Sequence, residues 1–438
     1  MRTVRLEFGR AETEAGVTAR SSGAHIGFWV LSVVALMADA GVGMSRGKAA
    51  SIASAQTAGA PLRKIAELEL PGPPGKRFDY LTIDEDDNYL LSAHLGAGLL
   101  HVIDLKTNAV VKTIRDVPGV EGVAYIAEGK KVYTANWGEN KIGVVDLTGA
   151  SVIKRLPTED KPDGIAYAAP FHKAYVSNER AKAESVIDVR TDTIVKVLRF
   201  DSETGVPQYD PVARKVYVNL QDRDTLAVID PATDTVVDRY RVDGCRGNHG
   251  MAIDGERHRA FLSCEGNDTL TVFDLEAHRA IAHFPMAKGA DVVMFDRGLG
   301  RVYVACASGA ISVFQMDDPA RFRKLGDVPV EPRIHSFAVD PRTHRVYAPA
   351  EQEKGRPASK LRSSWRCAPF YSSRHQRGPT AHSSPRTRPL PTRVKSRPSS
   401  AISTSSGPAG GTRSRLPAWC STMASRSGWS WSASFVSR

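Results

Sequence analysis

Carboxylate and imidazole side chains recur at a nearly constant interval along this chain of 438 residues. The first such set comprises Asp79, Glu121, Asp163, Thr204, His249, Ala290 with the neighbouring Asp291, and His335. Carboxylates and imidazoles bind divalent cations, and sets rich in oxygen ligands suit Ca²⁺ or Mg²⁺. If the fold brings Asp79, Glu121, Asp163 and His249 to one opening, their chemistry predicts a site for a divalent cation such as Ca²⁺.

A second set keeps the same interval and contains His94, Asn136, Asn178, Leu220, Cys264, Cys306 and Ala350. Its polar members His94, Asn136 and Asn178 are candidates for the same ligand-binding surface. The alternative for both sets is that they are solvated loop residues that cap strand ends, since polar residues are common in loops. We favour this alternative because no spacing motif fixes a metal site.

The interval belongs to a repeat that occurs seven times. An aromatic or apolar residue marks each copy at steps of 42 or 44 residues: Leu91, Tyr133, Tyr175, Tyr217, Phe261, Tyr303 and Tyr347. A second column has six members: Asp104, Asp146, Asp188, Asp230, Asp274 and Gln315. A strand-rich repeat of this length is typical of a β-propeller, with one blade per repeat. The predicted fold is therefore all-β, a seven-bladed β-propeller with an imperfect last blade and disordered N- and C-terminal segments.

The unit from Gly205 to Val242 shows the expected strands most clearly. They are predicted at Val206–Tyr209, Lys215–Asn219, Leu226–Ile229 and Thr235–Tyr240, with turn-forming residues between them. The strands are apolar at consecutive positions, as in a sheet that packs on both faces. A β-sandwich is the alternative, but seven copies in register favour the propeller. In a blade the first strand begins and the second ends on one face, so both polar sets are expected around the mouth of a central channel.

The repeat resembles the YVTN-type, forty-residue-repeat propellers of the YncE family. The resemblance is carried by Tyr133-Thr-Ala-Asn136, Tyr175-Val-Ser-Asn178 and Tyr217-Val-Asn-Leu220, and by the third strands Leu226-Ala-Val-Ile-Asp230 and Leu270-Thr-Val-Phe-Asp274. It covers residues 62–355 and is specific for the fold rather than for an activity. It implies a secreted or periplasmic protein of a family without a general chemistry. The same fold also hosts calcium-dependent lactonases, which use carboxylates at such a mouth, and accessory domains of redox enzymes.

The seventh copy breaks off, which bears on the closure of the ring. Strands are expected at Ser336–Asp340 and Arg345–Ala350, but no in-register third strand follows, so the propeller domain is placed at residues 61–355. The alternating stretch Arg63–Leu70 is expected to supply the fourth strand, because pairing the two chain ends in one blade closes a propeller. Blade seven is therefore predicted to be weak and to expose an edge that favours aggregation.

Residues 1–60 are predicted to be an export signal and a linker. Ile26–Ala38 is an apolar run of signal-peptide length that is short for a membrane span. Ala38-Asp-Ala40 and Ala53-Ser-Ala55 match small-residue cleavage sites. The alternative is a disordered segment with an incidental apolar patch. We favour export, which predicts a periplasmic or secreted protein with no transmembrane span beyond this signal.

Residues 356–438 form a basic tail rich in Ser, Arg and Pro. Residues 361–438 hold 12 Arg, one Lys and no Asp or Glu, a charge of +13 against +11 for the whole chain, so residues 1–360 carry −2. The high isoelectric point thus belongs to the tail, and the propeller itself is not expected to bind nucleic acid. The tail could be a basic arm that binds nucleic acid or a disordered linker. Our hypothesis is a third possibility, a shifted reading frame, because the repeat ends abruptly.

Two of the five cysteines could form a disulfide, which would suit an oxidising compartment. Cys245 and Cys264 bracket the first strand of blade five on one face, so a disulfide between them is sterically plausible. Cys306 lies one blade further on and could compete as partner. Buried free thiols, or metal binding by Cys245, Cys264 and His249, are the alternatives.

Three functions remain open from the sequence. The first is an exported binding scaffold for a protein, glycan or small-molecule ligand, which would use the channel mouth. The second is a metal-dependent hydrolase of the lactonase type, with Asp79, Glu121, Asp163 and His249 around the cation. The third is nucleic-acid binding by the tail. The sequence has no nucleophile elbow, Walker loop, dinucleotide fingerprint or c-type haem motif, and we favour the non-catalytic scaffold.

Overall fold

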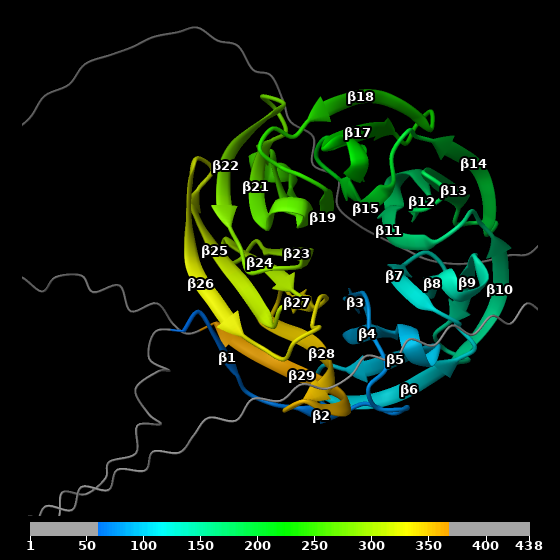
Figure 1. The fold of residues 1–438 in the computed structure, drawn as a ribbon. Coiled ribbons are helices and arrows are strands. Elements are labelled where there is room, and N and C mark those ends of the chain that lie inside the picture. The colour runs from blue at the N-terminus through cyan, green and yellow to red at the C-terminus, as the bar shows by residue number, and fades with distance from the viewer. Residues whose placement is uncertain (1–59, 368–438) are drawn as a thin grey trace, which may run out of the picture. The chain divides into compact units, whose positions relative to one another are not determined.

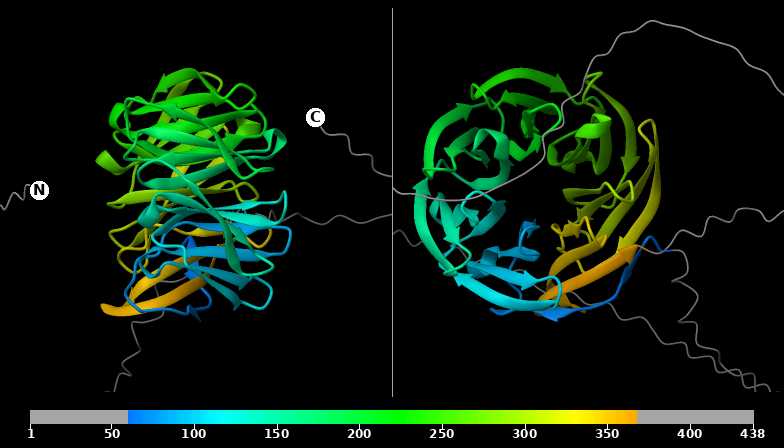
Figure 2. Two further views of the ribbon diagram at one scale, coloured as in Figure 1. Left: turned by 90° about the vertical axis from the view of Figure 1, so that its right-hand side faces the viewer. Right: turned by 180° about the vertical axis from the view of Figure 1, so that it is seen from behind.

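The computed structural model describes residues 60–367, and this part of the chain is all-β apart from short 3₁₀ turns (Figure 1). Seven antiparallel sheets stand around a common axis, six of them with four strands and one with five. Figure 2 shows the same ring edge-on and from behind. The predicted seven-bladed β-propeller is therefore confirmed.

The strands follow the repeat in chain order. Blades one to three are β3 (Leu81–Asp84), β4 (Tyr89–His94), β5 (Leu99–Asp104) and β6 (Ala109–Arg115); β7 (Val120–Ile126), β8 (Lys131–Asn136), β9 (Lys141–Asp146) and β10 (Ser151–Pro157); and β11 (Pro162–Ala168), β12 (Lys173–Asn178), β13 (Ala183–Asp188) and β14 (Thr193–Arg199). Blades four to six are β15 (Thr204–Asp210), β16 (Lys215–Leu220), β17 (Thr225–Asp230) and β18 (Thr235–Arg241); β19 (Asn248–Asp254), β20 (Arg259–Cys264), β21 (Thr269–Asp274) and β22 (Arg279–Pro285); and β23 (Ala290–Asp296), β24 (Arg301–Cys306), β25 (Ala310–Asp318) and β26 (Arg321–Pro329). The four strands predicted for blade four match β15 to β18.

The repeated residues explain why neighbouring blades pack together. The anchor tyrosines are buried, and the Tyr175 hydroxyl donates a hydrogen bond of 2.6 Å to Asp234 in the next blade. Tyr133 makes the equivalent bond to Asp192. The repeated aspartates are also structural, because Asp104 Oδ1 accepts bonds from the Lys106 and Thr107 backbone amides at 2.7 and 3.0 Å and so fixes the turn. The most regular columns of the repeat therefore stabilise the fold, and function has to be sought in the columns that vary.

Blade seven closes the ring with both ends of the described chain. Its strands are β27 (Ala338–Asp340), β28 (Arg345–Glu353) and β29 (Arg356–Cys367), and β1 (Leu62–Lys64) and β2 (Leu68–Glu69) pair with the outer edge of β29. In Figure 1 the blue N-terminal strands run beside the orange β29. The prediction that the stretch after Arg63 supplies an outer strand is confirmed.

The prediction that no third strand follows Gly355 is wrong. β29 occupies that place over 12 residues, so the propeller extends past the predicted boundary. Leu361 is buried, and Arg362 bridges Glu67 and Glu331 at 3.3 and 2.6 Å. The strand was missed because its sequence is basic and lacks the Val- and Ile-rich pattern, while the pairing is imposed by β28 on one side and β1 on the other.

Two sequence predictions lie outside the described residues. These are the export signal at Ile26–Ala38 and the basic tail from residue 368 onwards, with the shifted reading frame proposed for it. Within residues 60–367, no helix is long and apolar enough to cross a membrane.

Candidate functional site

One residue stands at or just before the start of each innermost strand, and the charged members of this set act on one another electrostatically. Together these residues form what we call the mouth ring: Asp79, Glu121, Asp163, Gly205, His249, Asp291 and His335. The register corrects Thr204 to Gly205 and assigns the position in blade six to Asp291 rather than Ala290, both of which the sequence analysis named. Thr204 pairs with Leu220 and Ala290 with Cys306, as Val120 pairs with Asn136, so Gly205 and Asp291 occupy the ring position. The interval of the repeat gives the same positions, since Gly205 follows Asp163 by 42 residues and Asp291 follows His249 by 42.

Glycines let the inner strands of neighbouring blades approach closely at the ring. A Cβ atom on Gly122 would lie 1.9 Å from the Asp163 carbonyl oxygen, and one on Gly250 would lie 2.2 Å from the Asp291 carbonyl oxygen. Any larger residue would therefore push the blades apart. The close approach brings the ring residues of successive blades near enough to interact electrostatically.

The two histidines of the ring are held as cations by aspartates. His249 Nε2 lies 3.2 Å from Asp291 Oδ1, and Gln221 contacts the other ring nitrogen at 3.2 Å. Burial alone would lower the pKa of His249, but the hydrogen bond and charge of Asp291 outweigh it and raise that pKa to about 10. His335 Nε2 lies 3.5 Å from Asp79 Oδ2, and the same balance of burial against the aspartate raises its pKa to about 9.

Glu121 and Asp163 are buried acids without a comparable cation. Their exposed fractions are 3% and 4%. Burial, followed by the charges of Asp163 and Asp79, raises the pKa of Glu121 to about 9. Burial also raises the pKa of Asp163 to about 7, although His249 acts in the opposite direction. At neutral pH Glu121 therefore carries a proton, and its Oε2 atom has no hydrogen-bond partner among the described residues.

The residues predicted to hold a cation do not form a site for one. Within the described part of the chain, no three His, Cys, Asp or Glu side chains are arranged to ligate a single ion. Both ring nitrogens of His249 already have partners, since Nε2 lies 3.2 Å from Asp291 and Nδ1 lies 3.2 Å from Gln221. Asp79, Glu121, Asp163 and His249 thus share the ring but do not fit a Ca²⁺ centre.

The second predicted set lies inside the blades. His94, Asn136 and Asn178 have no exposed surface. Asn178 bonds Ser185 at 2.9 Å, Asn136 bonds Glu139 at 3.0 Å, and His94 bonds His101 at 3.2 Å. These three side chains form hydrogen bonds inside the blades, and a ligand cannot reach them without rearrangement of the blades.

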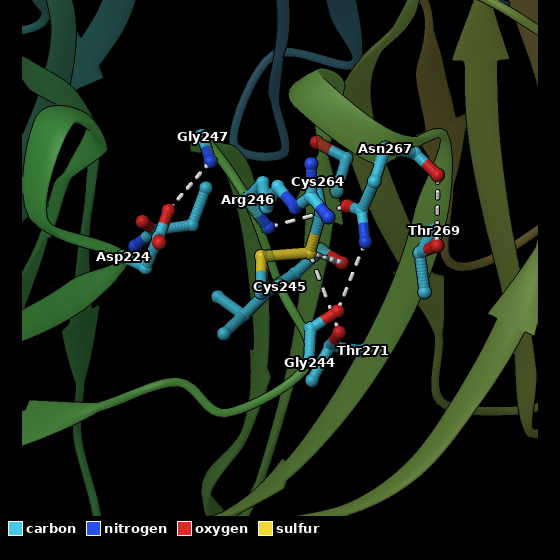
Figure 3. The surroundings of a disulfide bond; sticks show 12 residues. Asp224, Gly244, Cys245, Arg246, Gly247, Cys264, Asn267, Thr269 and Thr271 are labelled. Carbon is cyan, nitrogen blue, oxygen red and sulfur yellow. Dashed lines mark hydrogen bonds between the residues drawn. A yellow bond between two sulfur atoms is a disulfide. The ribbon is translucent and has the colours of Figure 1, made fainter.

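A disulfide joins Cys245 to Cys264, the pairing that the sequence left open (Figure 3). The bond ties the loop before β19 to the end of β20, with the two Cα atoms 5.3 Å apart. Asn267 reinforces the loop by donating a 3.0 Å bond to the Gly244 carbonyl. Because the two sulfurs are bonded to each other, they are not thiolate ligands for a metal. Cys306 is a buried thiol, and burial raises its pKa to about 11.

The sequence analysis missed an outer set of charges on the mouth face. Two residues before the ring, the repeat places Arg77, Lys161 and Arg333. One residue after the second predicted set it places Glu179, Glu265 and Glu351. Lys161 pairs with Glu179, Arg333 pairs with Glu351, and Arg77 lies 3.2 Å from Asp79. The same steps of 42 or 44 residues would have revealed these columns. Part of the set lines a hollow of about 280 Å³ between blades five, six, seven and one.

Comparison with known proteins supports the fold class alone. No family model matches the chain, and no curated protein matches it by sequence. Solved structures do match. Hydrazine synthase of Kuenenia stuttgartiensis aligns with a TM-score of 0.57 and 16% identity over 65% of this chain and 94% of that one. The WD40 repeats of RRP9 align with a TM-score of 0.59 and 13% identity over 70% and 100%, and a chain of a mitotic checkpoint complex with 0.58 and 11% over 77% and 98%. The protein is thus a seven-bladed β-propeller.

Proposed function

We propose that this protein is an exported, YncE-like propeller that binds a partner through the face carrying the mouth ring. The observation that supports this proposal most is a set of six ionisable side chains, three of them buried and three partly buried, at ring positions where blade four carries only Gly205. Desolvating charged groups costs free energy, and the fold accepts a residue without a side chain there. Charges kept at such positions are therefore a candidate functional feature rather than a requirement of the ring.

Other observations agree with a binding role and with export. The opposite face is made of the turns that the repeated aspartates fix, whereas the mouth face varies from blade to blade, as expected of a recognition surface on a rigid scaffold. The disulfide suits an oxidising compartment and so supports a periplasmic or secreted location. A protein, a glycan or a small molecule could bind such a surface. We favour a protein, because structures such as the mitotic checkpoint complex contain this fold.

Site-specific photo-crosslinking in cells that express the protein tests this proposal. A photoreactive residue is placed at exposed mouth-face positions, Arg180 or Arg333, and at matched exposed positions on the opposite face, Lys106 or Glu276. We expect a discrete adduct from the mouth face and none from the opposite face. Equal labelling of both faces, or no adduct from either mouth position, would contradict a partner-binding mouth. Cell fractionation of the same samples tests the location, and recovery from the cytoplasm would contradict export.

A further inference from the structure

The hollow on the mouth face exists because blade six carries small residues at two positions. In blade six, Gly289 occupies the position two residues before the ring. Ala307 occupies the position one residue after the second predicted set, which we call the second column. In the other blades the second column holds larger side chains: Leu95, Trp137, Glu179, Gln221, Glu265 and Glu351. Blade six is the one blade that combines a glycine with an alanine at these two positions. Because these residues are small, a volume of about 280 Å³ stays open.

Charges of both signs line this hollow. Arg77, Arg333 and His335 contribute positive charge, and Glu265, Asp291 and Glu351 contribute negative charge. Several are only partly used within the protein. The Arg77 side chain is 47% exposed, and within the described residues its only side-chain hydrogen bond is the 3.2 Å contact of one nitrogen with Asp79. No ion pair joins Glu265 to another residue within the described range, and Glu265 lines the hollow together with Arg77.

We infer that this hollow binds a small zwitterion of amino-acid size, with the ligand carboxylate on Arg77 and its ammonium group on Glu265. This inference rests on the proposed role of the mouth face in binding. Guanidinium groups match carboxylates with paired hydrogen bonds, and an ammonium group suits carboxylate acceptors. A singly charged ligand would satisfy one side only. The volume is just below the range of drug-sized pockets, and no large apolar side chain lines it, so a small hydrophilic molecule fits best.

Calorimetric titration of the full chain tests the charge pattern directly. The probes are glycine, β-alanine and 4-aminobutyrate, which separate the two charges progressively, with acetate and methylammonium as single-charge controls. We expect at least one zwitterion to bind at least tenfold more tightly than either control. The inference is overturned if acetate or methylammonium binds as well as the best zwitterion, or if no zwitterion binds at 10 mM (roughly the weakest affinity worth calling a site).

Two variants at the same column position separate filling of the hollow from general damage. Ala307→Gln introduces the residue that blade four carries at this position, where Gln221 contacts the ring histidine His249, so the fold should accept it. Leu95→Gln introduces the same side chain at the equivalent position of blade one, which does not line the hollow, and serves as the control. We expect Ala307→Gln to weaken zwitterion binding at least tenfold and Leu95→Gln to leave it unchanged, with similar melting temperatures. Undiminished binding to Ala307→Gln would overturn the inference, as would unchanged binding to Glu265→Gln.

The crosslinking and calorimetric results together separate failure of this inference from failure of the proposed function. Crosslinks from Arg333 in the absence of zwitterion binding would overturn this inference alone. Zwitterion binding without any crosslink would support the inference and remove the protein partner from the proposed function.

Discussion

Glu184 is a buried acid at a position where the repeat otherwise carries an apolar residue. The same position in other blades is occupied by Leu100, Ile142, Leu226, Leu270 and Ile311, all buried. The Ser177 hydroxyl lies within hydrogen-bond distance of both Glu184 and the Gly205 carbonyl, the latter at 2.6 Å. Since the carbonyl can only accept, Ser177 donates to it, and Glu184 must donate to Ser177. The carboxyl is therefore protonated, consistent with a pKa that burial raises well above its ordinary value.

We expect Glu184→Leu to stabilise the protein, and to do so more strongly as the pH rises. A folded-state pKa above the ordinary value of 4.5 means that the folded protein binds more protons than the unfolded chain, so wild-type stability is lost as the pH rises from 4.5 through the folded pKa. Leucine removes this dependence together with a buried polar group that costs about 1–3 kcal/mol. Urea unfolding at pH 5 and pH 8.5 measures the effect. Glu184→Gln, which keeps a donor to Ser177, is the control, and a constant difference between wild type and Glu184→Leu at both pH values would contradict the assignment.

His94 and His101 form a second buried titratable pair, inside blade one. His94 stacks on Phe78 with ring centroids 3.9 Å apart, and its Nδ1 lies 3.2 Å from His101 Nε2. Burial lowers the pKa of His94 to about 4 and that of His101 to about 3. Both imidazoles are consequently neutral at the pH of most cellular compartments.

Acid should destabilise the propeller through this pair. The unfolded chain binds protons below pH 6.5 and the folded protein does not until about pH 4, so stability falls across that window by about 1.4 kcal/mol per pH unit for each histidine. Blade three holds Asn178 and Ser185 at the same two positions, bonded at 2.9 Å. The double variant His94→Asn/His101→Ser should lose this part of the slope in chemical denaturation between pH 7 and pH 4. An unchanged slope would show that these imidazoles titrate normally.

The mouth ring shows how far residue types alone could be interpreted. Spacing predicted that Asp79, Glu121, Asp163 and His249 converge, and they do share the ring. It could not predict that His249 is paired with Asp291 and that Glu121 is protonated, because these states depend on distances between blades. The ring position of Gly205 was missed, although this residue follows Asp163 by the 42-residue step of the repeat, whereas Asp291 was already named beside Ala290.

At the scale of elements, the disulfide holds the loop that precedes β19 against the end of β20. The two cysteines are separated by 19 positions, and Glu265 and His249 lie close to them in sequence. The bond therefore restrains two side chains of the mouth face as well as the blade. Closing a loop of this size restricts the unfolded chain and contributes roughly 3 kcal/mol.

Removal of this disulfide should lower stability by about 2–4 kcal/mol. The variant Cys245→Ala/Cys264→Ala is compared with wild type by thermal and urea unfolding, with and without reductant. Reductant should bring wild type close to the variant and leave the variant unaffected. Cys306→Ala, which removes the buried free thiol, is the matched control and should remain sensitive to reductant. If reductant has no effect on wild type, the bond is absent in solution.

Strand positions were largely predictable, with one informative exception. Blades with the full Val- and Ile-rich pattern could be parsed to within two residues, as β15 to β18 show. β29 could not, because Arg356–Cys367 owes its strand conformation to neighbours on both sides rather than to its own residues. Leu361 is its clearest local signal, a buried residue in register with Pro349 of β28 and Leu68 of β2.

At the scale of the whole molecule, closure depends on three segments that are far apart in sequence. β28 and β1 do not pair with each other, and β29 lies between them and pairs with both. Lys360 connects the same three segments through ion pairs of 2.7 Å to Glu67 and 2.8 Å to Glu353. The ring therefore closes through residues 356–367, a stretch that the sequence analysis assigned to the tail.

Truncation at two points tests this account of closure. A chain ending at Cys367 keeps β29 and should unfold in one cooperative transition, with a midpoint close to that of the full chain. A chain ending at Gly355 loses β29, so β1 and β2 have no partner and the outer edge of β28 is exposed. We expect it to aggregate or to unfold without cooperativity in circular dichroism and light scattering. Equal stability of the two truncations would contradict closure by β29 and would restore the boundary at Gly355, because a ring that holds without its last middle strand does not need the segment that follows.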